Sequence, residues 1–193
     1  MRWANGPRAA WPASSRAIRS HTSRVRPLAD RAAADRREAG RSFGEYTLLE
    51  RVALGGMAEV WRARRRGVEG FQKTVAIKKI LAHLTDSPDF VNMFIDEAKL
   101  AAQLNHSNIL HIYDLGKIDR SHYIAMEYID GESLADLVAK GPLPLKDAIS
   151  YASQMAEGLK AAHRKDVVHR DVKSGNMMLT SDGTIKILEF GMA

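Results

Sequence analysis

The chain of 193 residues contains no cysteine. It therefore has no disulfide bond and no thiolate metal site, which fits a reducing compartment, and we expect a cytoplasmic protein. No uninterrupted apolar run approaches the roughly 18 residues of a membrane span. Aromatic residues are few, at 7%, but contents of 45% hydrophobic and 27% charged residues are ordinary for a globular protein. The length suffices for a domain with a substantial hydrophobic core.

The net charge of +6 belongs to the N-terminal segment alone. Residues 1–40 contain nine Arg, no Lys and three acidic residues, which leaves 20 basic and 20 acidic residues in 41–193. The body is therefore neutral overall, and we expect no nucleic-acid partner for it.

Residues 1–42 are predicted to form a disordered basic tail, because they are rich in Arg, Ala, Ser and Pro and lack helical or strand periodicity. Mitochondrial transit peptides share this composition, and so do disordered basic arms that bind nucleic acid. We favour an unstructured extension that the fold does not need, with a targeting segment and a binding arm as the alternatives.

The globular body is predicted to begin near Phe43 with two strands, at 46–52 and 59–64. Gly55 and Gly56 lie in the turn between them, where the absence of a side chain lets the backbone approach a ligand closely. A glycine-bearing hairpin is common, so this feature alone indicates a hairpin and no more.

A lysine and a glutamate stand in apolar surroundings. Strand alternation in "KTVAIKK" puts Ala76 and Lys78 on one face, although a lysine in a strand is usually an edge charge in solvent. Ser87-Pro88 is predicted to open a helix in which Glu97 lies within an apolar stripe, with no Lys or Arg three or four residues away. Because an unpaired buried carboxylate costs several kcal/mol, we expect Lys78 to be its partner. The alternative places Glu97 at the edge of the stripe, in water.

The next segment is predicted to contain a strand that leads into a polar connection at 127–132, followed by a helix that starts at Ser133. Residues 145–163 then form an amphipathic helix. Its apolar side carries Ile149, Ala152, Ala156, Leu159 and His163.

Asp182-Gly183 is a signal for a two-residue hairpin loop between apolar runs. Such a loop pairs Thr180 with Ile185, Met178 with Ile187 and Asn176 with Glu189. The amide of Asn176 and the carboxylate of Glu189 then lie side by side, and Asp171 adds a second carboxylate. Oxygen ligands of this kind suit a hard divalent cation that carries phosphate oxygens.

Four motifs in this order resemble those of eukaryotic-type protein kinases. "ALGGMAEV" is similar to the glycine-rich loop over ATP, "VAIK" to the strand lysine and "HRDVKSGN" to the catalytic loop, while "EFG" stands where the family has DFG. "GGMAEVW" resembles the bacterial branch. The resemblance covers 43–193 and implies an α+β kinase-like fold: an antiparallel β N-lobe with one helix (43–126), a hinge (127–132) and the start of a mainly helical C-lobe (133–193).

The resemblance implies a serine/threonine protein kinase that transfers phosphoryl groups from ATP to a protein hydroxyl with Mg²⁺. It assigns Lys78 to the α- and β-phosphates, paired with Glu97, and Asp171 to the proton of the substrate hydroxyl. Lys173, which is similar to serine/threonine rather than tyrosine kinases, stabilises the transferring phosphoryl group. The metal ligands that it implies are Asn176 and Glu189.

The resemblance also implies the nucleotide contacts. The loop residues are Ala53, Leu54, Gly55, Gly56, Met57 and Ala58; the adenine is enclosed by Val60, Ala76 and Met178, with Met126 behind it; and the hinge contacts are the backbone of Glu127, Tyr128 and Ile129.

Three departures from the family pattern stand out: alanine replaces glycine at Ala53 and Ala58, Ser174 replaces proline, and Glu189 replaces aspartate. The sequence stops two residues after "EFG", so we expect a truncated kinase of low activity alone. Its apolar helix side at 145–163 is expected to be uncovered and open to a partner. The alternatives are a pseudokinase-like fragment that binds nucleotide or a partner, and the product of a broken reading frame.

Overall fold

The computed structural model describes residues 39–190, so the predicted tail lies outside the described residues apart from 39–42. The described chain forms two compact units. We call residues 39–91 and 114–128 the sheet unit, and residues 92–113 and 129–190 the helical unit. The predicted boundaries of the two lobes and the hinge stay predictions.

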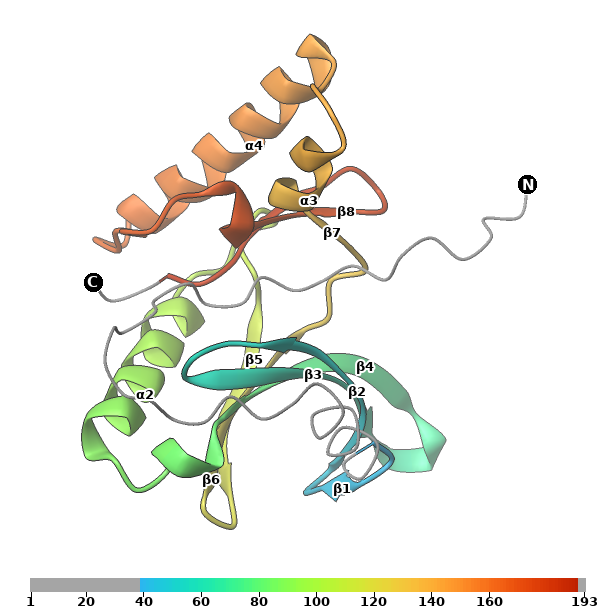
Figure 1. Cartoon of the computed structure of the whole chain (residues 1–193), viewed down its shortest axis with the longest axis vertical. Coiled ribbons are helices and arrows are strands. Elements are labelled where there is room, and N and C mark those ends of the chain that lie inside the picture. The colour runs from blue at the N-terminus through green and yellow to red at the C-terminus, as the bar shows by residue number, and fades with distance from the viewer. Residues whose placement is uncertain (1–38, 191–193) are drawn as a thin grey trace. The chain divides into compact units, whose positions relative to one another are not determined.

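The sheet unit is built on a six-stranded sheet in the order β1-β2-β3-β4-β6-β5 (Figure 1). The pairs β1–β2, β2–β3, β3–β4 and β4–β6 are antiparallel. Both predicted strands of the first hairpin are confirmed, and each extends further than expected. The strand bounds are β1 Ser42–Phe43, β2 Tyr46–Leu54, β3 Ala58–Arg66, β4 Gln72–Ile80, β5 Ile112–Ile118 and β6 Ser121–Glu127.

One face of this sheet forms the core of the sheet unit. Alternate residues of β4, Val75 and Ile77, pack there with Trp61 and Tyr123, and Tyr46 meets Tyr123 edge-on at 5.6 Å between ring centroids. This confirms the prediction that Val75 and Ile77 lie on the opposite face of the sheet from Ala76 and Lys78. Burial raises the pKa of the Tyr46 hydroxyl above its ordinary range.

Helix α2, Pro88–Ala102, begins where Ser87-Pro88 predicts. Its buried residues are Phe94, Ala98 and Ala101. Glu97 is half-buried, so it lies at the margin of the stripe rather than at its centre.

The helical unit contains two further helices and a small sheet. Helix α3, Leu134–Ala139, is capped by Ser133, whose Oγ accepts a hydrogen bond from the Asp136 N–H at 3.0 Å. Helix α4 spans Leu145–His163. The sheet has the order β7-β8-β9, with bounds β7 Gly131–Ser133, β8 Met177–Thr180 and β9 Ile185–Ile187. None of the described helices is long and apolar enough to cross a membrane.

Strand β7 occupies part of the segment predicted to be a polar connection. Gly131 makes this pairing feasible, because a Cβ atom there would lie 2.1 Å from the Leu179 carbonyl oxygen. The close approach of two backbones thus requires glycine at this position.

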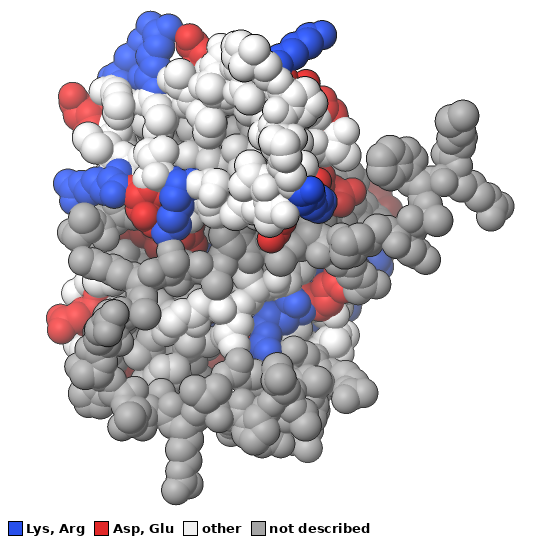
Figure 2. Space-filling model, turned by 45° about the horizontal axis from the view of Figure 1, so that its top comes forward, with Lys and Arg blue, Asp and Glu red and all other residues white. Residues whose placement is uncertain are grey.

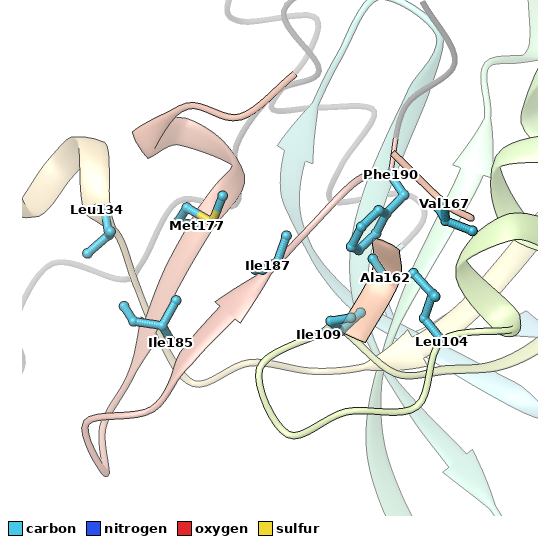
Figure 3. Packing of buried hydrophobic residues seen from close by; sticks show 9 residues of the cluster. All are labelled: Leu104, Ile109, Leu134, Ala162, Val167, Met177, Ile185, Ile187 and Phe190. Carbon is cyan, nitrogen blue, oxygen red and sulfur yellow. The ribbon is translucent and has the colours of Figure 1, made fainter. Parts of the chain in front are cut away.

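The core of the helical unit gathers residues that are far apart in the sequence (Figure 3). Helix α4 contributes Ala162, and its Gly158 lies so close to Ile187 that a Cβ would meet the Ile187 side chain at 2.6 Å. The cluster consists of Leu104, Ile109, Leu134, Ala162, Val167, Met177, Ile185, Ile187 and Phe190.

Helix α4 packs on the core through large and small apolar residues, among them Met155, Leu159 and Ala162, and most of its predicted apolar side is exposed. Ile149 is 60% exposed, and Ala152, Ala156 and His163 are exposed as well. Leu159, the fifth residue of this side, instead packs against the core of the helical unit. A partner that covers the exposed part stays a prediction.

The register predicted for the β8–β9 hairpin is wrong by one residue. Met177 pairs with Ile187 and Leu179 with Ile185, so the loop has three residues, 181–183. Gly183 adopts the left-handed region at φ 85°, which a three-residue hairpin loop requires. The observed register places Met177 and Leu179 beside Ile185 and Ile187 in one core, whereas the predicted register would have divided these residues between two faces.

Candidate active site

Lys78 is fixed in the interior of the sheet unit. It lies on β4, opposite Val60 on β3 and Ile124 on β6, and is only 5% exposed. A strand paired on both sides is not an edge strand, which excludes the interpretation of Lys78 as a solvent-facing edge charge. A buried ammonium group at this depth needs a charged or polar partner.

The predicted adenine-contacting residues of the sheet unit come together around Lys78. Ala76, one of its neighbours on the same face, pairs with Met126, and Ala53 pairs with Val60. Val60, Ala76 and Met126 are all buried. The loop from Ala53 to Ala58, with Leu54, Gly55, Gly56 and Met57, is closed by a hydrogen bond of 2.8 Å from the Gly55 N–H to the Ala58 carbonyl.

Of the residues predicted to contact the nucleotide or to pair with Lys78, three belong to the helical unit: Glu97, Ile129 and Met178. Ile129 and Met178 are buried, and Met178 pairs with Lys186 rather than with Ile187. The pairing of Lys78 with Glu97 and the enclosure of adenine by residues of both units stay predictions, as does the hinge contact at Glu127.

The predicted catalytic residues Asp171 and Lys173 and the predicted metal ligand Asn176 form one cluster in the helical unit. The Lys173 ammonium group is ion-paired with Oδ2 of Asp171. The Asn176 side-chain amide donates to the same Oδ2 at 3.0 Å and to the Asp171 carbonyl at 2.9 Å. A short 3₁₀ turn, Ser174–Asn176, brings the three side chains together, so serine in place of proline does not prevent the turn.

The Asp171 carboxylate is held in its ionised form. The hydrogen bond from Lys173, followed by that from Asn176, lowers the pKa of Asp171 below its ordinary value. Its side chain is 54% exposed. Within the described chain, both side-chain bonds to Asp171 fall on Oδ2, which leaves Oδ1 able to accept a proton.

His169 supports the Asp171 segment from below the surface, and the sequence interpretation missed it. It is 1% exposed; its Nδ1 accepts a hydrogen bond from the Asp171 N–H at 3.3 Å, and its Nε2 donates to the Leu188 carbonyl at 2.9 Å. Burial lowers the pKa of His169, which keeps the ring neutral. The ring thus ties the Asp171 loop to the segment before Glu189. A histidine two residues from a catalytic aspartate, after two valines, was the available signal.

Glu189 does not pair with Asn176 as predicted. The corrected register puts Leu188 there instead, and the Leu188 N–H donates to the Asn176 carbonyl at 2.9 Å. Glu189 follows in the left-handed region at φ 39°, where Asp and Asn are more frequent than longer side chains. Glu189 nevertheless stays close to Asn176, because it directly follows Leu188, which is hydrogen-bonded to Asn176.

The side-chain oxygen of Asn176 is able to bind a metal ion. Its Oδ1 is buried and accepts no hydrogen bond from any described residue. No group of three or more His, Cys, Asp or Glu able to hold a metal occurs among residues 39–190. Mg²⁺ is commonly held by one or two protein ligands together with phosphates and waters, so an amide oxygen and one carboxylate fit it.

A second hydrogen-bond network holds β9 against α4. Gln154 accepts from the Ile185 N–H at 2.8 Å and donates to the Gly183 carbonyl at 3.1 Å. Buried Asn108 donates both to Gln154 Oε1 at 3.1 Å and to the Ile185 carbonyl at 2.9 Å. We call these two residues the amide clamp. It fixes the strand that leads to Glu189.

The described surface carries charges of both signs. In the view of Figure 2, Lys and Arg lie beside Asp and Glu in small mixed groups. This agrees with the equal numbers of basic and acidic residues in 41–193.

An antiparallel sheet with a buried lysine and an Asp–Lys–Asn cluster in a helical unit define a protein-kinase-like fold. The family model described as "Protein kinase domain" matches residues 46–193, and the chain belongs to this family. It is 41% identical over 164 residues to the tyrosine-protein kinase MasK of Myxococcus xanthus and 37% identical over 154 residues to the serine/threonine-protein kinase PrkC of Bacillus subtilis.

These matches cover 78% and 79% of this chain, but the chain spans only 25% of MasK and 23% of PrkC. Among solved structures, the kinase domain of PknI from Mycobacterium tuberculosis is similar, with 30% identity and a TM-score of 0.67. That match covers 80% of this chain and 61% of the PknI chain.

Proposed function

We propose that this chain supplies the ATP site and the catalytic loop of a serine/threonine protein kinase. The observation that carries the proposal is the ionised Asp171 carboxylate, bonded to Lys173 and Asn176 and connected through His169 to the Glu189 segment. Phosphoryl transfer needs a group that accepts the hydroxyl proton and cations that neutralise the phosphates. Because ATP is an intracellular substrate, we place the protein in the cytoplasm.

Each residue of the cluster has a distinct role in this proposal. Oδ1 of Asp171 accepts the proton of a Ser or Thr hydroxyl while the hydroxyl oxygen bonds to the γ-phosphorus and the bond to the ADP oxygen breaks. The Lys173 ammonium group neutralises charge on the transferring phosphoryl group. Lys78 binds the α- and β-phosphates. Asn176 Oδ1 and Glu189 would hold Mg²⁺, which supplies charge neutralisation and orientation of the phosphates when bound.

The acceptor class is inferred from Lys173 and from the similarity to PrkC, and the similarity to MasK makes tyrosine the alternative. The test is incubation of the purified chain with radiolabelled ATP, Mg²⁺ and casein, followed by phosphoamino-acid analysis. We expect weak label on serine and threonine with the unmodified chain, and no label with Asp171→Asn. Label of equal intensity in Asp171→Asn would contradict the catalytic role. Phosphotyrosine alone would overturn the acceptor class.

If neither the unmodified chain nor Asp171→Asn transfers label, but the chain binds ATP measurably, a nucleotide-binding pseudokinase would be favoured. That second candidate rests on Glu189 in place of aspartate and on its left-handed backbone. Both features bear on transfer more than on nucleotide binding.

A further inference from the structure

The turn between β3 and β4 combines a cavity with concentrated positive charge. The cavity has a volume of about 520 Å³ and lies wholly within the sheet unit. Three of its lining residues are basic, namely Arg65, Arg66 and Lys73, and one, Glu45, is acidic. A volume of this size is typical of sites that bind a small ligand or a few side chains of a peptide.

The basic residues are arranged at a cost to the sheet. Arg65 on β3 lies directly opposite Lys73 on β4, so the two cations project from the same face. Like charges in directly opposed positions destabilise an antiparallel pair. Arg65 and Lys73 together make one side of the cavity basic.

Glu45 pairs with Arg65, one of these basic residues. Its Oε2 accepts a hydrogen bond from Arg65 Nε at 3.0 Å, but the two side chains are 42% and 51% exposed. Exposed ion pairs contribute little and exchange partners easily. A carboxylate from another molecule can therefore share the Arg65 guanidinium, which has five donors.

Two exposed apolar side chains border the same cavity. Val68 is 85% exposed and Phe71 is 66% exposed. The turn that carries them is closed by a hydrogen bond of 2.7 Å from the Gly67 N–H to the Phe71 carbonyl. An apolar rim next to basic side chains matches a peptide that has both acidic and apolar residues.

We propose that this cavity binds an acidic peptide segment of a partner protein. Carboxylates of the segment contact Arg65 and Lys73, and an apolar side chain packs on Val68 and Phe71. A concave site with apolar side chains at its rim suits a peptide better than a flat anionic bilayer. The proposal is independent of kinase activity.

The test is fluorescence anisotropy of the full chain with a labelled synthetic peptide that contains Asp and Glu around one Phe. Lys73→Glu should weaken binding by about 10-fold or more, as expected when one partner of a contact reverses its charge. The matched control is Arg64→Glu: it changes the net charge equally, but Arg64 projects to the other face, opposite Thr74, and does not line the cavity. The Arg-rich residues 1–40 are present in every variant, so their contribution is constant.

Folding is checked in the same samples by thermal unfolding. Lys73→Glu places opposite charges across the strands, so its midpoint should hold or rise while binding falls. If the midpoint drops, Lys73→Ala takes its place, with a smaller expected loss of binding. Phe71→Ala should weaken binding of the peptide that contains Phe. Binding of a peptide with Ala in place of Phe should be unchanged.

Three results would overturn the proposal. One is equal loss of binding in Arg64→Glu and Lys73→Glu, and another is full binding in both Lys73 variants. The third is binding to phosphatidylserine vesicles without binding to the peptide, which would assign the surface to a membrane instead.

Discussion

The two units position their functional side chains by different means. In the sheet unit, Lys78 is placed by backbone pairing of β4 with β3 on one side and β6 on the other. In the helical unit, Asp171 lies in a loop and is placed by side-chain bonds from Lys173 and Asn176 and by the contact of its N–H with His169. Many backbone hydrogen bonds therefore hold Lys78 in place, whereas a few side chains hold Asp171.

This difference bears on how each half responds to mutation. A strand ladder distributes its support over many residues, so removal of one side chain leaves the backbone in place. A side-chain network loses its geometry with a single member, because the remaining buried polar groups are left unsatisfied. Substitutions in the Asp171 network should therefore disturb the local structure more than comparable substitutions around Lys78.

The largest effect is expected at Glu189. Replacement by aspartate shortens the side chain by one methylene and suits the left-handed backbone at φ 39° better. A displacement of about 1 Å can cost ~10²-fold in rate when catalysis depends on positioning, so Glu189→Asp should raise turnover by up to that factor. The measurement is steady-state transfer by this chain joined to the C-terminal remainder of a related kinase lobe. An equal or slower rate would show that this site accommodates the longer side chain.

An intermediate effect is expected at the amide clamp. Gln154→Ala removes the acceptor of the Ile185 N–H and one acceptor of the Asn108 amide. Unsatisfied buried groups cost about 1–3 kcal/mol in the free energy of unfolding, which denaturant titration measures. Ser153→Ala, at the exposed neighbouring position of α4, is the matched control. Equal stability of the two variants would mean that the clamp does not hold β9.

The smallest effect concerns pH. Burial lowers the pKa of His169 below its ordinary value of 6.5, so the folded state binds this proton less readily than the unfolded state. Its contribution to stability is complete above pH 6.5 and is lost as pH falls from there toward the lowered pKa. His122 is shifted in the same direction. Substitution with His169→Gln should therefore reduce, but not remove, the loss of stability on acidification, and an unchanged slope would contradict the assignment.

The same contrast explains what the sequence could predict. Period-two alternation in "KTVAIKK" predicted the separation of Ala76 and Lys78 from Val75 and Ile77, because a strand ladder follows a local pattern. The Asp171 segment was found through its motif. The amide clamp was missed, because hydrogen bonds between residues 46 and 77 positions apart leave no local pattern.

Turn chemistry caused the error in register. Asp182-Gly183 suggested a two-residue loop, but Gly183 is the third residue of the loop 181–183. Both loops are compatible with the same dipeptide, and only the burial of Met177 with Ile187 decides between them. The side of α4 that packs in the core was predicted only in part: Leu159 belongs to it, whereas Tyr151 and Met155 were missed.

The most direct test of the account is titration calorimetry of ATP with and without Mg²⁺. The account predicts that Lys78→Met abolishes ATP binding in both conditions, whereas Asn176→Ala loses only the increase in affinity that Mg²⁺ confers. Lys79→Met is the matched control, because the Lys79 ammonium group is ion-paired with Glu59 at 3.0 Å. It should bind ATP as the unmodified chain does. Unchanged ATP affinity in Lys78→Met would contradict the assignment of this chain as the nucleotide site of a protein kinase.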